Sequence, residues 1–289
     1  MNYEKVIQNI RGELKSYIRL HNIKSLVIGI SGGIDSCLCA ALAKPVCNEL
    51  GIPLIGRSLP ASSNQPDELE RAKLTGKVFC TEFDEIKIED EYNFMVVRLE
   101  SNFPRITEEN KIRNGNLKAR LRMIRLYDVA SLRQGMVLST DNYTELMLGF
   151  WTLHGDVGDY GMIQNLWKTE VYDMAEWIAE NECMFIDEQT SITSTIEALA
   201  TDGLGVTNRG DLGQILPSWE GSSREGYKEV DRILQVWENH FTLESNQKTL
   251  IALAYEKNPI VQRHLRTQFK RENPINISRA VILYGPGVK

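Results

Sequence analysis

The sequence predicts an α/β fold in which a doubly wound parallel sheet carries helices on both faces. Two observations predict it. Short runs typical of strands alternate with longer helical patterns along the first half of the chain. Each short run is mainly apolar, as in strands that are covered on both faces. We therefore expect right-handed crossovers between parallel strands.

The elements follow in order along the chain. An amphipathic helix is expected within the first twenty residues, because its apolar residues recur at helical spacing. The predicted strands are Leu26–Ile30, Leu54–Leu59, Val78–Phe83 and Met136–Ser139. The predicted helices among and after them are Asp35–Leu50, Asp67–Lys77, Asn116–Arg133 and Thr169–Asn181.

The last third of the chain has a weaker pattern. Residues 190–227 are rich in Thr, Gly and Ser, which predicts a flexible loop region. Helical patterns return at Glu225–Asn239 and Ser245–Lys257 and form a C-terminal tail. We expect residues 1–289 to form a single domain with these two appendages.

Composition excludes several classes of protein. The formal net charge is −6, so the surface as a whole does not favour nucleic acid as a partner. We find no apolar run near ~18 residues, and expect no association with a membrane. The five cysteines lack CxxC spacing, which indicates neither a disulfide framework nor a zinc site and favours a reducing cytoplasm.

The stretch VIGISGGIDSCLCAALA, Val27–Ala43, places two glycines where a strand becomes a helix. Backbone N–H groups at a helix start bind anions, and glycine lets the backbone approach them, so a phosphate is expected here. Asp35 would repel a phosphate unless it holds a Mg²⁺ that the phosphates share. The alternative is that Ser31 and Asp35 only cap the helix.

The segment SGGIDS resembles the SGGxDS signature of the ATP-pyrophosphatase (PP-loop) superfamily, whose fold is adenine nucleotide alpha hydrolase-like. The resemblance implies that ATP is a co-substrate, cleaved between its α and β phosphates to adenylate a substrate oxygen. It also implies an ATP-binding segment made of Gly29, Ile30, Ser31, Gly32, Gly33, Ile34, Asp35 and Ser36.

Two further stretches, GNLKARLRMIRLYDVA at Gly115–Ala130 and VLSTDNYTELMLGFWTLHGDVGD at Val137–Asp159, resemble the NAD synthetases. This resemblance implies an ammonia-dependent ligase, active in NAD biosynthesis, that amidates deamido-NAD through an acyl-adenylate. It also implies Mg²⁺ as the metal cofactor and a homodimer. We find no segment before the first strand that fits a glutaminase domain.

Helical spacing places Leu117, Leu121 and Ile124 on one face, and Arg120 shares that face. A buried arginine needs a partner, which is either an anionic substrate or a structural carboxylate, unless its head reaches solvent. Lys118, Arg122 and Arg125 fall on other faces and are expected in solvent. The family resemblance favours substrate binding by Arg120.

Glu145 opens a helix, where it either forms a capping box with Asn142 or binds Mg²⁺ as a second carboxylate. The resemblance implies the second role and assigns the remaining site. The catalytic residues are then Asp35, Glu145 and Lys168, with Asp35 and Glu145 as metal ligands. ATP would also contact Arg57, Thr140, Lys168 and Thr190, and the acceptor substrate would contact Arg120, Asp159 and Lys270.

Three positions depart from the family pattern: Ser139 replaces a glycine, Leu153 a lysine and Phe269 a histidine. The last two fall on the side expected to hold the acceptor. This leaves open the same chemistry on nicotinate mononucleotide or another carboxylate, or a nucleotide-binding homologue without catalysis. For Lys168 and Lys270, an exposed lysine without a specific role is the alternative.

Overall fold

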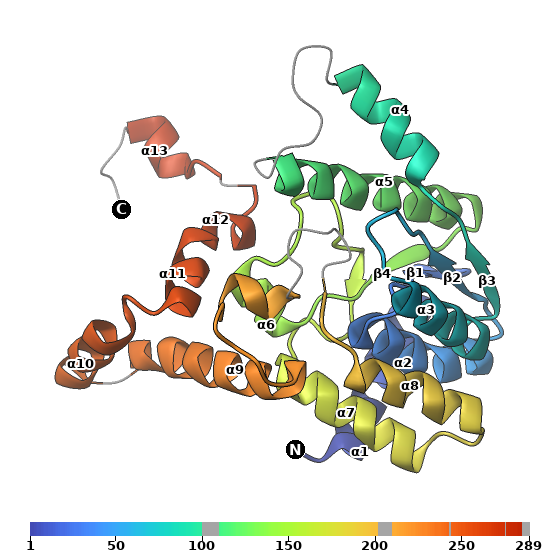
Figure 1. Cartoon of the computed structure of the whole chain (residues 1–289), viewed down its shortest axis with the longest axis horizontal. Coiled ribbons are helices and arrows are strands. Elements are labelled where there is room, and N and C mark those ends of the chain that lie inside the picture. The colour runs from blue at the N-terminus through green and yellow to red at the C-terminus, as the bar shows by residue number, and fades with distance from the viewer. Residues whose placement is uncertain (100–109, 202–209, 243, 275, 285–289) are drawn as a thin grey trace.

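The computed structural model describes residues 1–99, 110–201, 210–242, 244–274 and 276–284. A parallel sheet lies between two layers of helices, which confirms the predicted fold class (Figure 1). Its strands follow the order β3-β2-β1-β4-β5. They are β1 Leu26–Gly29, β2 Leu54–Ser58, β3 Glu82–Glu85, β4 Met136–Ser139 and β5 Tyr160–Gly161.

The central strand β1 sets the position of the site. Leu26 pairs with Leu54 of β2 on one side and with Met136 of β4 on the other. The strand order reverses at this point, because the chain runs from β1 outward to β3 and then returns to β4. In open parallel sheets, ligands bind beyond the carboxyl ends of the strands at such a reversal.

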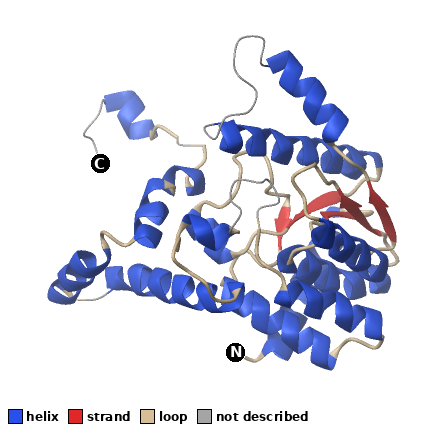
Figure 2. Ribbon diagram, viewed as in Figure 1, coloured by secondary structure: helices blue, strands red, loops and turns tan. Residues whose placement is uncertain are grey.

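Helices cover both faces of the sheet (Figure 2). One layer contains α1 Tyr3–His21, α2 Ile34–Leu50, α3 Pro66–Phe79, α7 Lys168–Asn181 and α8 Ile186–Glu197. The other contains α4 Glu89–Leu99 and α5 Lys111–Leu132. No helix in the described ranges is long and apolar enough to cross a membrane.

Alternate residues of β1, β2 and β4 contribute to two separate apolar cores. Leu26 and Ile28 face the core that contains α2 and α7, whereas Val27 faces the core under α5. This explains why β1 and β4 are almost entirely apolar. Helix α2 is buried on almost every side from Ile34 to Cys47, and its sequence is correspondingly apolar.

The rest of the chain forms an arm beside the sheet (Figure 1). Within it, α9 packs against α6 and α7, and α11 packs against α6 and α9. The elements are α6 Tyr143–Leu148, the 3₁₀ turn η2 Asp211–Gln214, α9 Ser223–Asn239, η3 His240–Thr242, α10 Ser245–Tyr255, α11 Pro259–Arg266, α12 Gln268–Arg271 and α13 Arg279–Tyr284.

Two predicted elements have the wrong bounds. The strand expected at Val78–Phe83 is split, because α3 continues to Phe79 and β3 begins only at Glu82. The loop expected at residues 190–227 begins inside helix α8 and ends inside α9, while its residues 202–209 lie outside the described part. Helix α8 forms despite its Ser and Thr content because Ser191, Ile192 and Thr195 are buried, and tertiary packing overrides propensity.

Candidate active site

The loop between β1 and α2 is held in shape by its own serines. The Ser36 hydroxyl donates to Gly33 O at 3.1 Å and accepts from Ser31 N at 3.2 Å. The Ser31 hydroxyl accepts from Gly33 N at 3.2 Å. Ser36 is 2 % exposed, so its first role is to fix this loop. The loop therefore presents a pre-formed backbone turn at the N-terminus of α2.

Gly32 is required by this turn. Its φ is +85°, a conformation that residues with a side chain rarely adopt. A Cβ at this position would lie 2.1 Å from Glu68 O of α3. Arg71 of the same helix donates through Nε to Gly32 O at 3.0 Å. The turn and α3 are thus in direct backbone contact.

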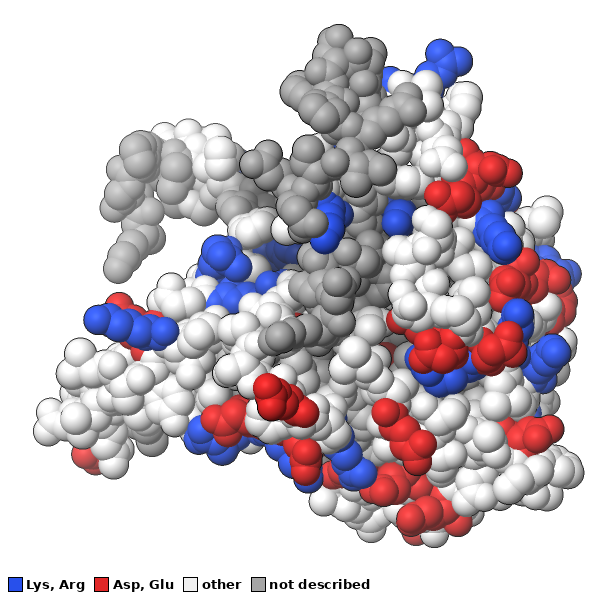
Figure 3. Space-filling model, in the orientation of Figure 1, with Lys and Arg blue, Asp and Glu red and all other residues white. Residues whose placement is uncertain are grey.

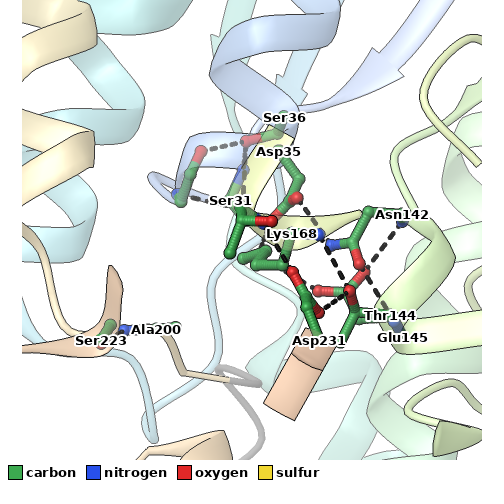
Figure 4. Close-up of polar contacts among 12 residues, drawn as sticks. Ser31, Asp35, Ser36, Asn142, Thr144, Glu145, Lys168, Ala200, Ser223 and Asp231 are labelled. Atoms are coloured by element: carbon green, nitrogen blue, oxygen red, sulfur yellow. Dashed lines mark hydrogen bonds and ion pairs between the residues drawn. The ribbon is translucent and has the colours of Figure 1, made fainter. Parts of the chain in front are cut away.

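Two carboxylates and one lysine meet beyond the ends of β1 and β4 (Figure 4). Lys168, the first residue of α7, forms ion pairs with Asp35 and, at 3.3 Å, with Glu145. Asn142 links the same groups, because its side chain donates to Asp35 Oδ1 at 2.9 Å and accepts from Glu145 N at 3.0 Å. We call these three charged residues the acid–lysine cluster.

Burial controls the charges of the acid–lysine cluster. It raises the pKa of the Glu145 carboxyl, and Lys168 offsets part of that rise. For Lys168, burial alone lowers the pKa, but Asp35 and Glu145 outweigh it and raise that pKa well above its ordinary value. Although Lys168 is only 2 % exposed, the two acids keep its ammonium group protonated.

A cavity of about 480 Å³ opens over the carboxyl ends of the strands. The glycine turn, both cluster carboxylates and residues of α5 line it. Lys168 lies behind the two carboxylates and outside the lining. Eleven of the predicted residues line the cavity: Gly29, Ile30, Ser31, Gly32, Gly33, Asp35, Ser36, Arg57, Thr140, Glu145 and Lys270.

Three cations from α11 and α12 also line the cavity, Arg263, Arg266 and Lys270, and we call this group the basic end. Lys and Arg side chains gather between α6, α11 and α12 on the face shown in Figure 3. Arg263 lies over the Phe150 ring at 3.8 Å and donates to Leu148 O at 3.0 Å. Burial, followed by the charge of Arg266, lowers the pKa of Arg263 to about 10, so this cation is incompletely compensated.

Besides Lys168, four of the predicted residues do not line this cavity. Ile34 is buried in the core behind the turn. Thr190 is exposed on α8. Asp159 accepts from Val137 N at 2.9 Å and from the Tyr127 hydroxyl at 2.8 Å, which anchors the end of β4. Arg120 is exposed and donates to Leu153 O at 3.2 Å.

The face of α5 predicted from apolar spacing is only partly buried: Leu121 is buried and Leu117 packs against the core, but Arg120 and Ile124 are exposed. Ile124 is 63 % exposed, whereas Ala119 and Leu126 are buried and face the sheet and the cavity. Arg122 lies on that inner side, where it lines the cavity and donates to Leu59 O at 3.0 Å. Lys118, also expected in solvent, is 8 % exposed. Small residues let this helix approach the sheet closely, and apolar spacing alone misses such a face.

Other lining residues were missed, although two of them lie within the predicted motif at Val137–Asp159. Asp141 follows Thr140 and is 8 % exposed, and burial raises the pKa of its carboxyl to about 7. Asp156, in the segment HGDVGD, accepts from Thr152 N at 2.8 Å. Asp156, not Asp159, is the acid of that segment that lines the cavity. Thr201 replaces Thr190 there and donates to Glu68 Oε1 at 2.6 Å.

This fold and site define a nucleotide-activating α/β protein of the PP-loop class: a serine- and glycine-bounded turn at a helix start, with two acids beside it, at the reversal point of a parallel sheet. The sequence model of the NAD synthase family matches residues 6–191. The chain belongs to this family, and it is a ligase that forms a carbon–nitrogen bond.

Comparison with individual proteins agrees with this family membership. The chain is 35 % identical over 177 residues to the NH(3)-dependent NAD(+) synthetase of Finegoldia magna, a match that covers 61 % of this chain and 69 % of that protein. It resembles the structure of an NMN synthetase from Francisella tularensis with a TM-score of 0.73 and 23 % identity, over 96 % of this chain and 99 % of that one. It resembles the structure of an NH3-dependent NAD synthetase from Campylobacter jejuni with a TM-score of 0.67 and 23 % identity, over 96 % of this chain and 100 % of that one.

Proposed function

We propose that the protein amidates the nicotinate carboxylate of deamido-NAD with ammonia and consumes ATP. The observation that carries this proposal is that the glycine turn, Asp35 and Glu145 line one cavity together with the cations of the basic end. Named relatives that use ammonia to make NAD⁺ support the choice of substrates. A carboxylate is a poor acyl donor, so it must be activated before an amine can displace an oxygen.

The reaction has two steps. A carboxylate oxygen attacks the α-phosphorus of ATP, the bond to the bridging oxygen breaks, and pyrophosphate leaves toward the glycine turn. Ammonia then attacks the acyl carbon, loses a proton, and AMP leaves with the electrons of the broken carbon–oxygen bond. Backbone N–H groups at the start of α2 stabilise the charge on the departing pyrophosphate. The basic end holds the anionic acceptor against the same cavity.

Asp35 and Glu145 suit a Mg²⁺ ion. Both carboxylates come from neighbouring strand ends and together already hold one cation, the Lys168 ammonium. Magnesium binds through one or two carboxylates and completes its shell with water and substrate phosphates. When bound there, it supplies positive charge to the phosphate oxygens. Within the described ranges, no group of three His, Cys, Asp or Glu residues is placed to hold a metal.

The assembly and its compartment belong to the same proposal. We infer a homodimer, because α5 presents exposed Ile124 and Leu132 on its outer side. Exposed apolar residues on one helix face support an interface between copies. We place the protein in the cytoplasm, since all five cysteines are free and a reducing compartment keeps them so.

Mass spectrometry of the products tests the function. With ATP, Mg²⁺, ammonium and deamido-NAD, we expect NAD⁺, AMP and pyrophosphate in equal amounts. Glutamine in place of ammonium is expected to support little turnover. Nicotinate mononucleotide in a parallel reaction tests the second acceptor, which the likeness to an NMN synthetase fold and the Leu153 and Phe269 departures motivate. An inert mixture that forms no AMP would contradict the proposal.

A further inference from the structure

Helix α9 reaches the acid–lysine cluster from outside the stretch that matches the family model. Asp231 of α9 is 1 % exposed and accepts from the Thr144 hydroxyl at 2.5 Å and from Thr169 N at 2.9 Å. The Thr144 oxygen in turn accepts from Lys168 N at 2.8 Å. One buried acid therefore joins the first turn of α6 to the first turn of α7 (Figure 4).

This arrangement fixes two members of the acid–lysine cluster relative to each other. Glu145 follows Thr144 on α6, and Lys168 and Thr169 are the first residues of α7. The first N–H groups of a helix have no partner inside it, and a negative charge there is favourable. For α7, Thr144 and Asp231 provide these acceptors. The ends of both helices thus depend on one carboxylate of α9.

A second residue of α9 approaches the same lysine. Tyr227 precedes Asp231 by one helical turn and lies on the same face. It is fully buried, and its ring centroid lies 5.5 Å from Lys168 Nζ.

The Asp231 carboxylate lies outside the cavity lining and so touches no substrate directly. Burial raises its pKa, which is a cost that its three backbone and hydroxyl donors reduce.

We propose that Asp231 is a positioning residue for the reaction: it holds the start of α7 against α6, so that Lys168 stays between Asp35 and Glu145. The carboxyl-terminal arm would then complete the active site, in addition to covering the sheet. The kinetic part of the test rests on the proposed function, whereas the structural part does not.

The test compares Asp231→Asn with Asp173→Asn. Asp173 also joins α7 to α9, through an ion pair with Arg224 at 2.8 Å, but it is 45 % exposed and lies a full turn beyond Lys168. Both substitutions weaken the same helix pair. Only Asp231→Asn leaves a single acceptor oxygen for the Thr144 hydroxyl and Thr169 N, because an amide nitrogen cannot accept a hydrogen bond, so one of these two donors loses its partner. Thr144→Val, which removes the hydroxyl between Asp231 and Lys168, serves as the third variant.

We expect Asp231→Asn and Thr144→Val to lower kcat at least tenfold at a temperature where each is fully folded, with KM for the acceptor changed less than twofold. Asp173→Asn is expected to keep kcat within twofold. A crystal structure of Asp231→Asn should show Lys168 Nζ beyond hydrogen-bonding distance of Glu145. An unchanged cluster in that crystal overturns the proposal whatever the substrate is. A kcat that falls equally in Asp231→Asn and Asp173→Asn also overturns it, because the loss is then one of helix packing.

Discussion

Lys168 is the residue on which the charge balance of the site depends. It is buried between Asp35 and Glu145, and both ion pairs lie within one cluster. Removing one partner of a buried ion pair leaves the remaining charge uncompensated, at a cost of about 3–5 kcal/mol. The two acids would then repel each other across the space that the ammonium fills.

Lys168→Met is therefore expected to lower the free energy of unfolding by about 3 kcal/mol or more at pH 8. The loss should be smaller near pH 6, because burial raises the pKa of Glu145 and protonation removes the repulsion. Urea unfolding at pH 8 and pH 6 measures the loss of unfolding free energy at each pH. Lys77→Met, at an exposed position of α3, is the matched control, with an expected change within about 0.5 kcal/mol. Equal unfolding energies of Lys168→Met and the wild type at pH 8 would disprove this account.

Asp156 carries a charge that the folded state disfavours. Burial raises the pKa of its carboxyl from 3.8 to about 6. The folded protein therefore holds this proton more tightly than the unfolded chain, and stability falls as the pH rises from about 4 through 6.

Asp156→Asn keeps an acceptor for Thr152 N but carries no charge. We expect its free energy of unfolding to exceed that of the wild type by about 1–3 kcal/mol at pH 8. The difference should shrink as the pH falls toward 4. Denaturant titrations across that range give the comparison. Glu13→Gln, at an exposed acid of α1, should show no such pH-dependent gain. A gain that stays constant from pH 4 to pH 8 would speak against the titration of Asp156.

At the scale of elements, the glycine turn is the least tolerant segment of the site. Gly32→Ala puts a methyl group against Glu68 O and forces a positive φ on alanine. We expect this variant to lose ATP binding by at least tenfold in calorimetry. Gly12→Ala, in the middle of α1 with nothing within 4 Å of the added atom, should instead raise the unfolding free energy by about 0.5–1 kcal/mol. Full ATP affinity in Gly32→Ala would show that this turn does not bind the nucleotide.

The turn and the strand ends were predictable because their physics is local. A glycine pair between an apolar strand and a helix indicates an anion site wherever it occurs, and parallel strands bring their carboxyl ends together. The inner face of α5 was not predictable in the same way. Gly115 and Ala119 are buried there because the backbones approach closely, whereas the larger Ile124 faces outward.

The contribution of the arm was also beyond sequence reasoning. Arg263 and Asp231 each lie in an ordinary amphipathic helix, so no local pattern separates them from surface charges. Their roles follow from which helices pack against α6 and α7, and that is a long-range property. Lys270 was found only through the family resemblance, and the structure places it on the cavity wall.

At the scale of the whole molecule, the outer side of α5 is the surface on which we expect two copies to meet. Ile124 is 63 % and Leu132 is 79 % exposed. A cation at the centre of an apolar contact is costly to bury. Ile124→Lys should therefore raise the dimer dissociation constant at least tenfold in sedimentation velocity. Leu20→Lys changes an equally exposed leucine of α1, on the other side of the sheet, and should leave association unchanged. A monomeric wild-type protein, or a dimer insensitive to Ile124→Lys, would exclude this interface.

The edge strand β3 has a consequence for how the molecule meets its own copies. Its sequence, Glu82–Glu85, carries three acids around one phenylalanine, and each acid forms an ion pair with a neighbouring cation, from Arg57, Lys73 or Arg133. A charged edge resists continuation of the sheet by another chain, since like charges would face each other across the new ladder. Growth into fibres through this edge is therefore disfavoured.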